Sequence, residues 1–166
     1  MPDPTPDLTP QPGDLAPDFE SATQTGQTLR LSDLRGRPVA LYFYPKDDTP
    51  GCTQQACNLR DHYGALLAAG VHVVGVSPDA AESHDAFAAK YALPFPLVAD
   101  PDRAVCRAYG VWGPRTLYGR LFEGVSRTTF LIGADGRILH VFRRPKTAQH
   151  AEEVLERLAA AGADAA

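Results

Sequence analysis

The sequence predicts an α/β domain, and three observations support this prediction. The apolar and aromatic runs "PVALYFYP" and "VHVVGVSPD" are typical of strands buried on both faces. Segments with helical spacing follow them, at residues 50–69 and 81–91, and this alternation indicates parallel strands. Later, "RTTFLI" and "RILHVF" flank "GADG", which favours a hairpin turn. A mixed central sheet flanked by helices is therefore expected.

The remaining elements follow from local signals along the chain. Residues 1–16 are rich in Pro, Thr and Asp and are expected to form a flexible tail before a domain over residues 17–162. Two short extended runs around Gly26 predict an N-terminal hairpin extension. Thr49 as N-cap and Pro50 at the first helical position begin the first helix, which Gly70 closes. The other expected segments are a strand in "FPLVAD", a short helix at 102–109, a loop at 110–126 and a last helix at 148–161.

Size, charge and cysteine content exclude several function classes. A chain of 166 residues fits one domain. A net charge of −4 argues against a nucleic-acid partner, and no stretch reaches the roughly 20 apolar residues that span a bilayer. The N-terminal residues lack the pattern of a secretory signal, so a reducing, cytoplasmic setting is expected. There, three cysteines do not form a disulfide framework, and a close pair is typical of catalysis or metal binding.

Cys52 lies where a central strand gives way to a helix. Its position in the first helical turn exposes it to unpaired backbone N–H groups and to the positive end of the helix dipole, which favour a thiolate. Gly51 adds little bulk beside the sulfur. An ordinary thiol is about 3% ionised at pH 7, so full ionisation raises its rate by at most about 30-fold. A reactive site here therefore needs further groups that stabilise the transition state.

The stretch "YPKDDTPGCTQQAC" resembles the peroxiredoxins, whose signature is Pro-x-x-x-Thr-x-x-Cys, and in particular their bacterioferritin-comigratory or peroxiredoxin Q branch. The resemblance continues through "PGDLAPDF", "LSDLRG", "YGVWG" and "RTTFLIGADGRILHVF". It implies a thioredoxin-like fold and a peroxidase that reduces hydrogen peroxide and organic hydroperoxides. It also implies that the chain is a monomer, that thioredoxin or a similar dithiol protein is its reductant, and that it needs no cofactor.

The resemblance assigns a role to each residue of the expected site. Cys52 matches the peroxide-attacking cysteine, Thr49 its hydroxyl partner and Pro45 the shield against water and over-oxidation. Arg127, distant in sequence, matches the pocket arginine, and Cys57 matches the resolving cysteine. Five residues along a helix place Cα atoms about 8.7 Å apart. A disulfide requires less than about 7 Å, so a Cys52–Cys57 bond implies that the start of the helix unwinds.

Other interpretations of the cysteine pair compete with this one. Two thiol–disulfide functions remain as alternatives, an oxidoreductase on the same fold and a redox-sensing or holdase module. The oxidoreductase is disfavoured because that chemistry typically uses C-x-x-C. An iron–sulfur site with His62 lacks further cysteines. Cys106 is interpreted as a core residue with a minority role as a redox thiol, the remaining histidines receive no catalytic role, and Asp47 and Asp48 are expected to be solvated.

Overall fold

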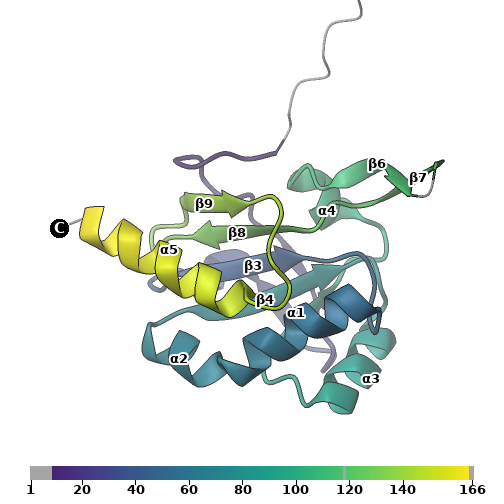
Figure 1. Ribbon diagram of the computed structural model, residues 1–166, viewed down its shortest axis with the longest axis horizontal. Coiled ribbons are helices and arrows are strands. Elements are labelled where there is room, and N and C mark those ends of the chain that lie inside the picture. The colour runs from purple at the N-terminus through teal and green to yellow at the C-terminus, as the bar shows by residue number, and fades with distance from the viewer. Residues whose placement is uncertain (1–8, 118, 165–166) are drawn as a thin grey trace, which may run out of the picture.

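The computed structural model describes residues 9–117 and 119–164 (Figure 1). Its main sheet has five strands in the order β5-β4-β3-β8-β9, with β3 in the centre. β3 pairs in parallel with β4, and β4 with β5, whereas β8 runs antiparallel to both β3 and β9. The strands of this sheet are β3 (Val39–Phe43), β4 (His72–Ser77), β5 (Leu97–Ala99), β8 (Thr128–Ile132) and β9 (Ile138–Phe142). The mixed sheet predicted from the sequence is confirmed.

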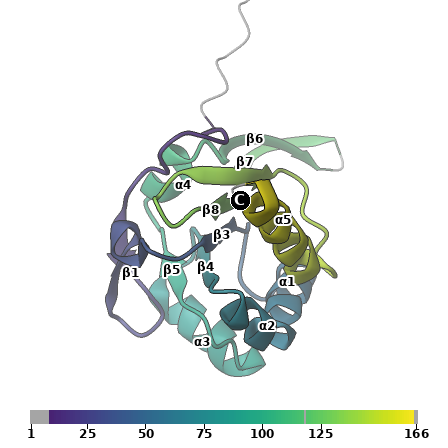
Figure 2. The same ribbon diagram turned by 90° about the vertical axis from the view of Figure 1, so that its left-hand side faces the viewer.

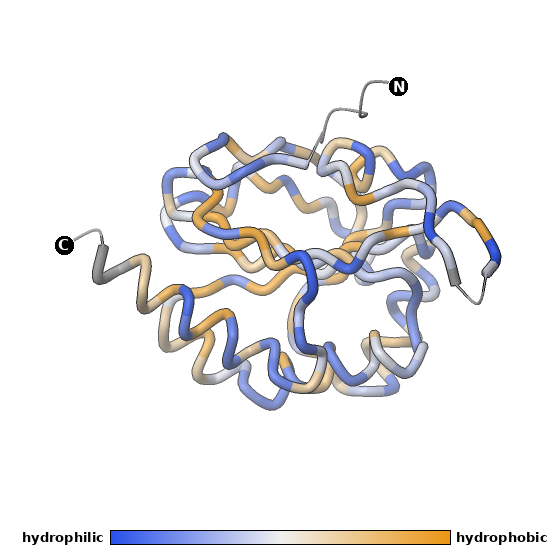
Figure 3. Tube along the Cα trace, turned by 45° about the horizontal axis from the view of Figure 1, so that its top comes forward, coloured by the Kyte–Doolittle hydropathy of each residue, from blue (hydrophilic) through white to orange (hydrophobic). Residues whose placement is uncertain are grey.

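The central strand β3 divides the core into two clusters, one on each face of the sheet. All five of its residues are buried. Leu41 and Phe43 point into a cluster that includes Phe130 and Tyr109. Because side chains alternate along a strand, Ala40 and Tyr42 point the other way, into a separate cluster that contains Cys52. Figure 3 shows the resulting pattern, with hydrophobic strands inside and hydrophilic segments on the outer side of the helices.

The helices distribute over these two faces (Figures 1 and 2). Four of them contribute to the cluster around Cys52, and the short α4 packs in the other cluster. The four are α1 (Pro50–Asp61), α2 (Tyr63–Ala68), α3 (Ala81–Tyr91) and α5 (His150–Asp164). α4 (Ala104–Ala108) shares its face with a short 3-10 helix, η1 (Leu31–Leu34). Helices on both sides of the sheet therefore cover it, as the sequence predicts.

Two hairpins lie outside the main sheet. The N-terminal hairpin joins β1 (Glu20–Ala22) and β2 (Thr28–Arg30) through a turn with Gly26 at φ +83°, as predicted. The second is a correction, because β6 (Trp112–Leu117) and β7 (Arg120–Val125) pair where a loop was expected. Gly and Pro in this segment obscure its strand pattern. A sheet of only two strands tolerates Pro114, since an edge position does not require its missing N–H.

The single helix expected at residues 50–69 is wrong in one respect, because it divides into α1 and α2 at His62. His62 has φ −106° and ψ 12°, outside helical values. Its Nδ1 atom lies 2.9 Å from the Asn58 carbonyl oxygen, to which its backbone N–H also points at 3.2 Å. A side chain that competes for a helix carbonyl weakens the helix locally. The break leaves α1 as a separate unit of twelve residues that carries both Cys52 and Cys57.

Part of the expected flexible tail is bound to the domain. The Gly13 N–H donates to the Ile138 carbonyl at 2.8 Å, and the Ala16 N–H donates to the Gly136 carbonyl at 2.9 Å. Residues 9–16 therefore add to the domain through backbone pairing that their composition does not reveal. Residues 1–8 of the predicted tail lie outside the described residues. In the described part of the chain, no helix is both long and apolar enough to cross a bilayer.

His150, at the start of α5, predicts a pH dependence of stability. It is fully buried, with Nε2 2.8 Å from Thr129 Oγ1 and Nδ1 3.1 Å from Glu153 Oε1. Burial lowers its pKa below the ordinary value of 6.5. As the pH falls, the unfolded chain therefore binds a proton near pH 6.5, whereas the folded chain binds it only at lower pH. The stability that this histidine contributes above pH 6.5 is lost as the pH falls from 6.5 to its lowered pKa in the folded protein.

We expect the free energy of unfolding to fall between pH 7 and pH 5.5 through this group, by at most about 1 kcal/mol. Urea unfolding at several pH values measures the slope, and His150→Gln should flatten it. His140, whose pKa is also lowered by partial burial, accounts for a remaining slope. An identical slope in wild type and His150→Gln would contradict the prediction.

Candidate active site

The site begins at the junction of β3 and α1, where the sequence places Cys52. Thr49 is the N-cap of α1 and Pro50 opens the helix, as expected. Cys52 follows in the first turn with only 1% of its surface exposed, packed among the residues of the cluster beneath α1. Backbone N–H groups at this end of the helix have no partners within the helix. The sulfur is therefore buried at a helix end whose unpaired N–H groups and dipole stabilise a negative charge.

Arg127 is distant from Cys52 in the sequence but places a full positive charge beside its sulfur. It immediately precedes β8, which pairs with β3, and its Nη2 atom lies 3.3 Å from Cys52 Sγ. A Cβ atom at Gly51 would lie 3.1 Å from the same Nη2, so glycine leaves room for this approach. An opposite charge at this distance favours the thiolate. The expected proximity of Arg127 and Cys52 is thus present in the fold.

Thr49 and Pro45 lie in the loop between β3 and α1. Thr49 does not cap the helix through its side chain, because its hydroxyl donates to the Lys46 carbonyl at 2.9 Å. With its proton engaged, the Thr49 oxygen has lone pairs left to accept a hydrogen bond. Pro45 is exposed in the same loop. Both therefore flank the start of α1, and the side-chain cap expected for Thr49 is replaced by a bond within the loop.

The other two cysteines have contrasting environments. Cys57 is half-buried on α1, one and a half turns beyond Cys52, and both are free thiols. Cys106 is fully buried in the cluster on the opposite face of the sheet from Cys52, which agrees with its interpretation as a core residue. Burial, with the Asp100 carboxylate, raises the pKa of the Cys106 thiol far above its usual range. Cys57 is therefore the only other cysteine on the element that carries Cys52.

Comparisons with known proteins agree with this geometry. A family model described as "AhpC/TSA family" matches residues 12–141. Peroxiredoxin Bcp of Escherichia coli (strain K12) is 48% identical over 143 residues, which cover 86% of this chain and 92% of the relative. The chain belongs to the AhpC/TSA family, as a peroxiredoxin of the Bcp or peroxiredoxin Q type. It is therefore a peroxidase, an antioxidant oxidoreductase, on a thioredoxin-like fold.

A second relative and a solved structure extend the likeness over most of this peroxiredoxin. Peroxiredoxin Bcp of Bacillus subtilis (strain 168) is 40% identical over 151 residues, 91% of this chain and 96% of the relative. A structure of Xanthomonas campestris peroxiredoxin Q is 36% identical, with a TM-score of 0.82, and the match covers 94% of this chain and 98% of that one. The fold and the peroxidase class thus rest on nearly the whole domain.

Gln55 is a residue of the peroxiredoxin site that the sequence analysis missed. It is fully buried on α1, one turn after Cys52, and its Oε1 atom accepts a hydrogen bond of 2.7 Å from Arg127 Nη1. Its Nε2 atom has no hydrogen-bond partner among the described residues. Leaving a buried polar group unpaired costs about 1–3 kcal/mol, so the bond to Arg127 has to offset the cost of burying this amide. A polar residue on the apolar face of a helix was the available signal.

We expect Gln55→Leu to slow the reaction of reduced protein with peroxide about tenfold. The loss of the acceptor releases one side of the Arg127 guanidinium, which then spends less time against the sulfur. Gln55→Met, which keeps the length of the side chain but has no comparable acceptor, should slow the reaction to the same extent. Stopped-flow measurement of Cys52 oxidation, with circular dichroism as a control for folding, tests this. Equal rates for Gln55→Leu and wild type would remove Gln55 from the site.

The two loop aspartates differ from the expectation that both are solvated. Asp48 is exposed, with Oδ2 2.7 Å from Lys90 Nζ, and a hydrogen bond from this lysine lowers its pKa. Asp47 is 8% exposed and faces inward, which corrects the prediction. A position in a charged loop predicts an exposed side chain. The inward orientation of Asp47 depends on partners from other elements, which the local sequence does not reveal.

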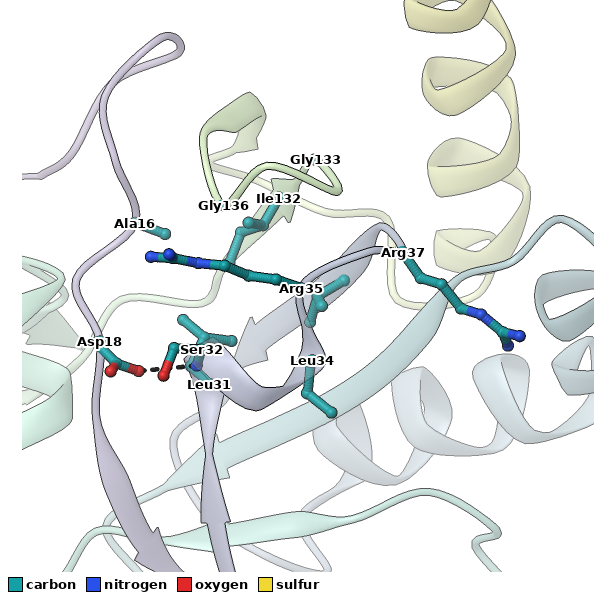
Figure 4. A pocket seen from close by; sticks show the side chains of 11 residues that line it. Ala16, Asp18, Leu31, Ser32, Leu34, Arg35, Arg37, Ile132, Gly133 and Gly136 are labelled. Atoms are coloured by element: carbon teal, nitrogen blue, oxygen red, sulfur yellow. Dashed lines mark hydrogen bonds between the residues drawn. The ribbon is translucent and has the colours of Figure 1, made fainter.

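Two pockets lie among the described residues near the elements discussed above, and they differ in their relation to the site. A groove beside the site is lined by Arg127, Thr128, Arg115 and Arg144, among others. A second pocket, shown in Figure 4, lies between the N-terminal segment, η1 and the turn after β8, around Leu31 and Ile132. None of the five expected site residues lines it. Of these five residues, only Arg127 lines the first groove.

Proposed function

We propose that this peroxiredoxin reduces hydrogen peroxide and organic hydroperoxides through Cys52, with Cys57 as resolving cysteine and thioredoxin as reductant. The observation that carries the proposal is the 3.3 Å contact between Arg127 Nη2 and the buried Cys52 sulfur at a helix start. A related protein supports the substrate class, since an alkyl peroxide reduction activity is described for the Xanthomonas campestris bacterioferritin comigratory protein. That protein is 35% identical with a TM-score of 0.81.

In the first step, the Cys52 thiolate attacks the nearer oxygen of the hydroperoxide and the O–O bond breaks. An S–O bond forms, sulfur is oxidised to sulfenic acid, and the departing oxygen takes a proton and leaves as water or an alcohol. Arg127 stabilises the charge that develops on the oxygens. The Thr49 hydroxyl donates its own hydrogen to the Lys46 backbone carbonyl, so its oxygen accepts a hydrogen bond from the hydroperoxide O–H. Pro45 limits access of water from the loop side.

In the second step, Cys57 attacks the Cys52 sulfenic acid, releases water and forms the disulfide. Thioredoxin, or a similar dithiol protein, then reduces this disulfide by thiol–disulfide exchange and becomes oxidised itself. The electrons come from the dithiol reductant throughout, so the proposed cycle requires no metal or organic cofactor. Neither step requires a second subunit or export, and we place a monomer in a reducing cytoplasm.

A coupled assay tests this function. Protein is mixed with reduced thioredoxin and either hydrogen peroxide or an alkyl hydroperoxide, and oxidised thioredoxin is counted against peroxide consumed. One thioredoxin per peroxide, with a Cys52–Cys57 bond detected by mass spectrometry, is expected. Thioredoxin oxidation without peroxide consumption would indicate a thiol–disulfide oxidoreductase instead. Single oxidation without turnover, together with capture of an unfolded client, would indicate a redox-sensing or holdase module.

A further inference from the structure

A buried carboxylate lies inside the loop that leads to the reactive cysteine. Asp47 is two residues before Thr49, and its side chain has three hydrogen-bond partners. It accepts from Tyr44 Oη at 2.6 Å and from Ser83 Oγ at 2.8 Å, and its Oδ2 atom lies 2.7 Å from His84 Nδ1. These partners come from the residue after β3 and from α3, so the carboxylate ties the loop to the body of the domain. Two hydroxyl donors on one buried carboxylate favour its ionised form.

His84 is the partner whose protonation decides the charge of this cluster. The ring is fully buried, and its Nε2 atom lies 2.9 Å from the Val98 carbonyl oxygen. A carbonyl can only accept, so Nε2 carries a hydrogen. Nδ1 lies 2.7 Å from the Asp47 carboxylate, a distance typical of a charge-assisted bond, which a hydrogen on Nδ1 would make. With both nitrogens protonated, the ring would be an imidazolium.

The other groups around the pair leave this assignment intact. From the loop after β4, Asp79 Oδ2 accepts hydrogen bonds from the Asp47 N–H at 2.8 Å and from Ser77 Oγ at 2.7 Å. Tyr44 Oη also lies 3.3 Å from His84 Nδ1, and Asp48 turns outward to Lys90. The carboxylates of Asp47 and Asp79 lie close enough to His84 to suggest a metal site. Their oxygens are already used in hydrogen bonds, which favours an ion pair.

We propose that His84 is a positioning residue for the peroxidase reaction, whose charge neutralises Asp47 so that a buried carboxylate can hold the loop without opposing the Cys52 thiolate. This inference rests on the proposed role of Cys52 as the nucleophile. Asp47 and Cys52 both lie within electrostatic reach of the buried Tyr42 hydroxyl, and a bare negative charge in this low-dielectric region would disfavour a second one nearby. The imidazolium removes that conflict and keeps the loop that carries Pro45 and Thr49 in place.

The test measures how readily Cys52 ionises, without peroxide, by the ultraviolet absorbance of its thiolate as a function of pH. All variants carry Cys57→Ser, and the raised pKa of the Cys106 thiol leaves Cys52 as the thiol that titrates. The curve of Cys52→Ser/Cys57→Ser is subtracted to remove the tyrosines. In this background, His84→Gln keeps a hydrogen-bond donor but loses the charge. Its titration should move to higher pH, and the rate with peroxide at pH 7 should fall about tenfold.

Three further variants separate charge from packing. Adding Asp47→Asn to His84→Gln removes both charges and should return the titration toward the parent. Ser83→Ala is the matched control, because it removes a neutral donor to the same carboxylate and should change little. Asp47→Asn alone removes the carboxylate, and the buried imidazolium, left without its partner, should lose a ring proton. Nitrogen NMR of this variant should therefore report a neutral ring, which keeps the test decisive if His84→Gln does not fold.

Two sets of outcomes would overturn the proposal. A titration unchanged in His84→Gln, or equally shifted in His84→Gln and in the double variant, would mean that His84 acts through packing alone. An equal shift in Ser83→Ala would assign the effect to hydrogen bonding. Nitrogen NMR of the parent should report two protonated ring nitrogens for His84, and a neutral ring would also refute the ion pair. If Cys52 titrates as expected but does not react with peroxide, the proposed function fails and the ion pair stands.

Discussion

Replacing Cys52 with serine is expected to lower peroxide turnover by several orders of magnitude, to the background of the assay. A serine hydroxyl stays neutral at this position and is a far weaker nucleophile than a thiolate, so neither Arg127 nor the helix start can compensate. The coupled thioredoxin assay measures the loss. The change from sulfur to oxygen at a site with 1% exposure should leave the circular dichroism spectrum unchanged.

Cys106→Ser is the control for this prediction, because Cys106 is equally buried but lies in the cluster on the other face of the sheet. It should keep turnover near the wild-type value, with some loss of stability from burying a hydroxyl. Retained turnover in Cys52→Ser would remove Cys52 from the mechanism. Equal loss in both variants would point to a common structural effect.

The sequence predicted those parts of this site that depend on local structure. The apolar runs place β3 and β4 in the sheet, and Thr49 with Pro50 marks the start of α1, because caps and strand patterns are local signals. Arg127 was located only by family resemblance, since 75 residues separate it from Cys52 and nothing in its own neighbourhood indicates the contact. The pairing of β8 with β3 creates that contact, and strand pairing is a property of the whole fold.

Other features could not be predicted because their partners come from distant elements. Gln55 acquires its role only when Arg127 approaches, and Asp47 turns inward only because α3 supplies Ser83 and His84. The hairpin of β6 and β7 was missed for a different reason. Its glycines and Pro114 are typical of loops, and two paired edge strands tolerate them.

The formation of a Cys52–Cys57 disulfide is expected to unwind the first half of α1. In the reduced protein both residues belong to one regular helix, where their Cα atoms are about 8.7 Å apart, beyond the reach of a disulfide. Backbone amides of residues 53–57 should therefore exchange slowly with deuterium before peroxide treatment and at least about tenfold faster after it. Mass spectrometry on the peptide covering residues 50–60 measures the difference.

Asn58 sets where this unwinding should stop. Its Oδ1 atom accepts the Ala151 N–H at 2.7 Å, and its Nδ2 atom donates to the Ala148 carbonyl at 3.0 Å and to Glu152 at 3.2 Å. These bonds fasten the middle of α1 to the first turn of α5. Protection of residues 59–61 and of α5 should persist in the oxidised protein, and Asn58→Ala should extend the fast exchange into residues 59–61.

Cys57→Ser distinguishes the disulfide from sulfenic acid formation as the cause. This variant still oxidises at Cys52 but cannot close the bond, so its α1 should stay protected after one equivalent of peroxide. With no resolving thiol, excess peroxide should convert Cys52 to sulfinic acid, which mass spectrometry detects as a second added oxygen. Equal protection in reduced and oxidised wild type would refute the unwinding mechanism. A bond from Cys52 to Cys106 would instead require opening of the sheet between the two clusters. It would show that Cys106, not Cys57, is the resolving cysteine.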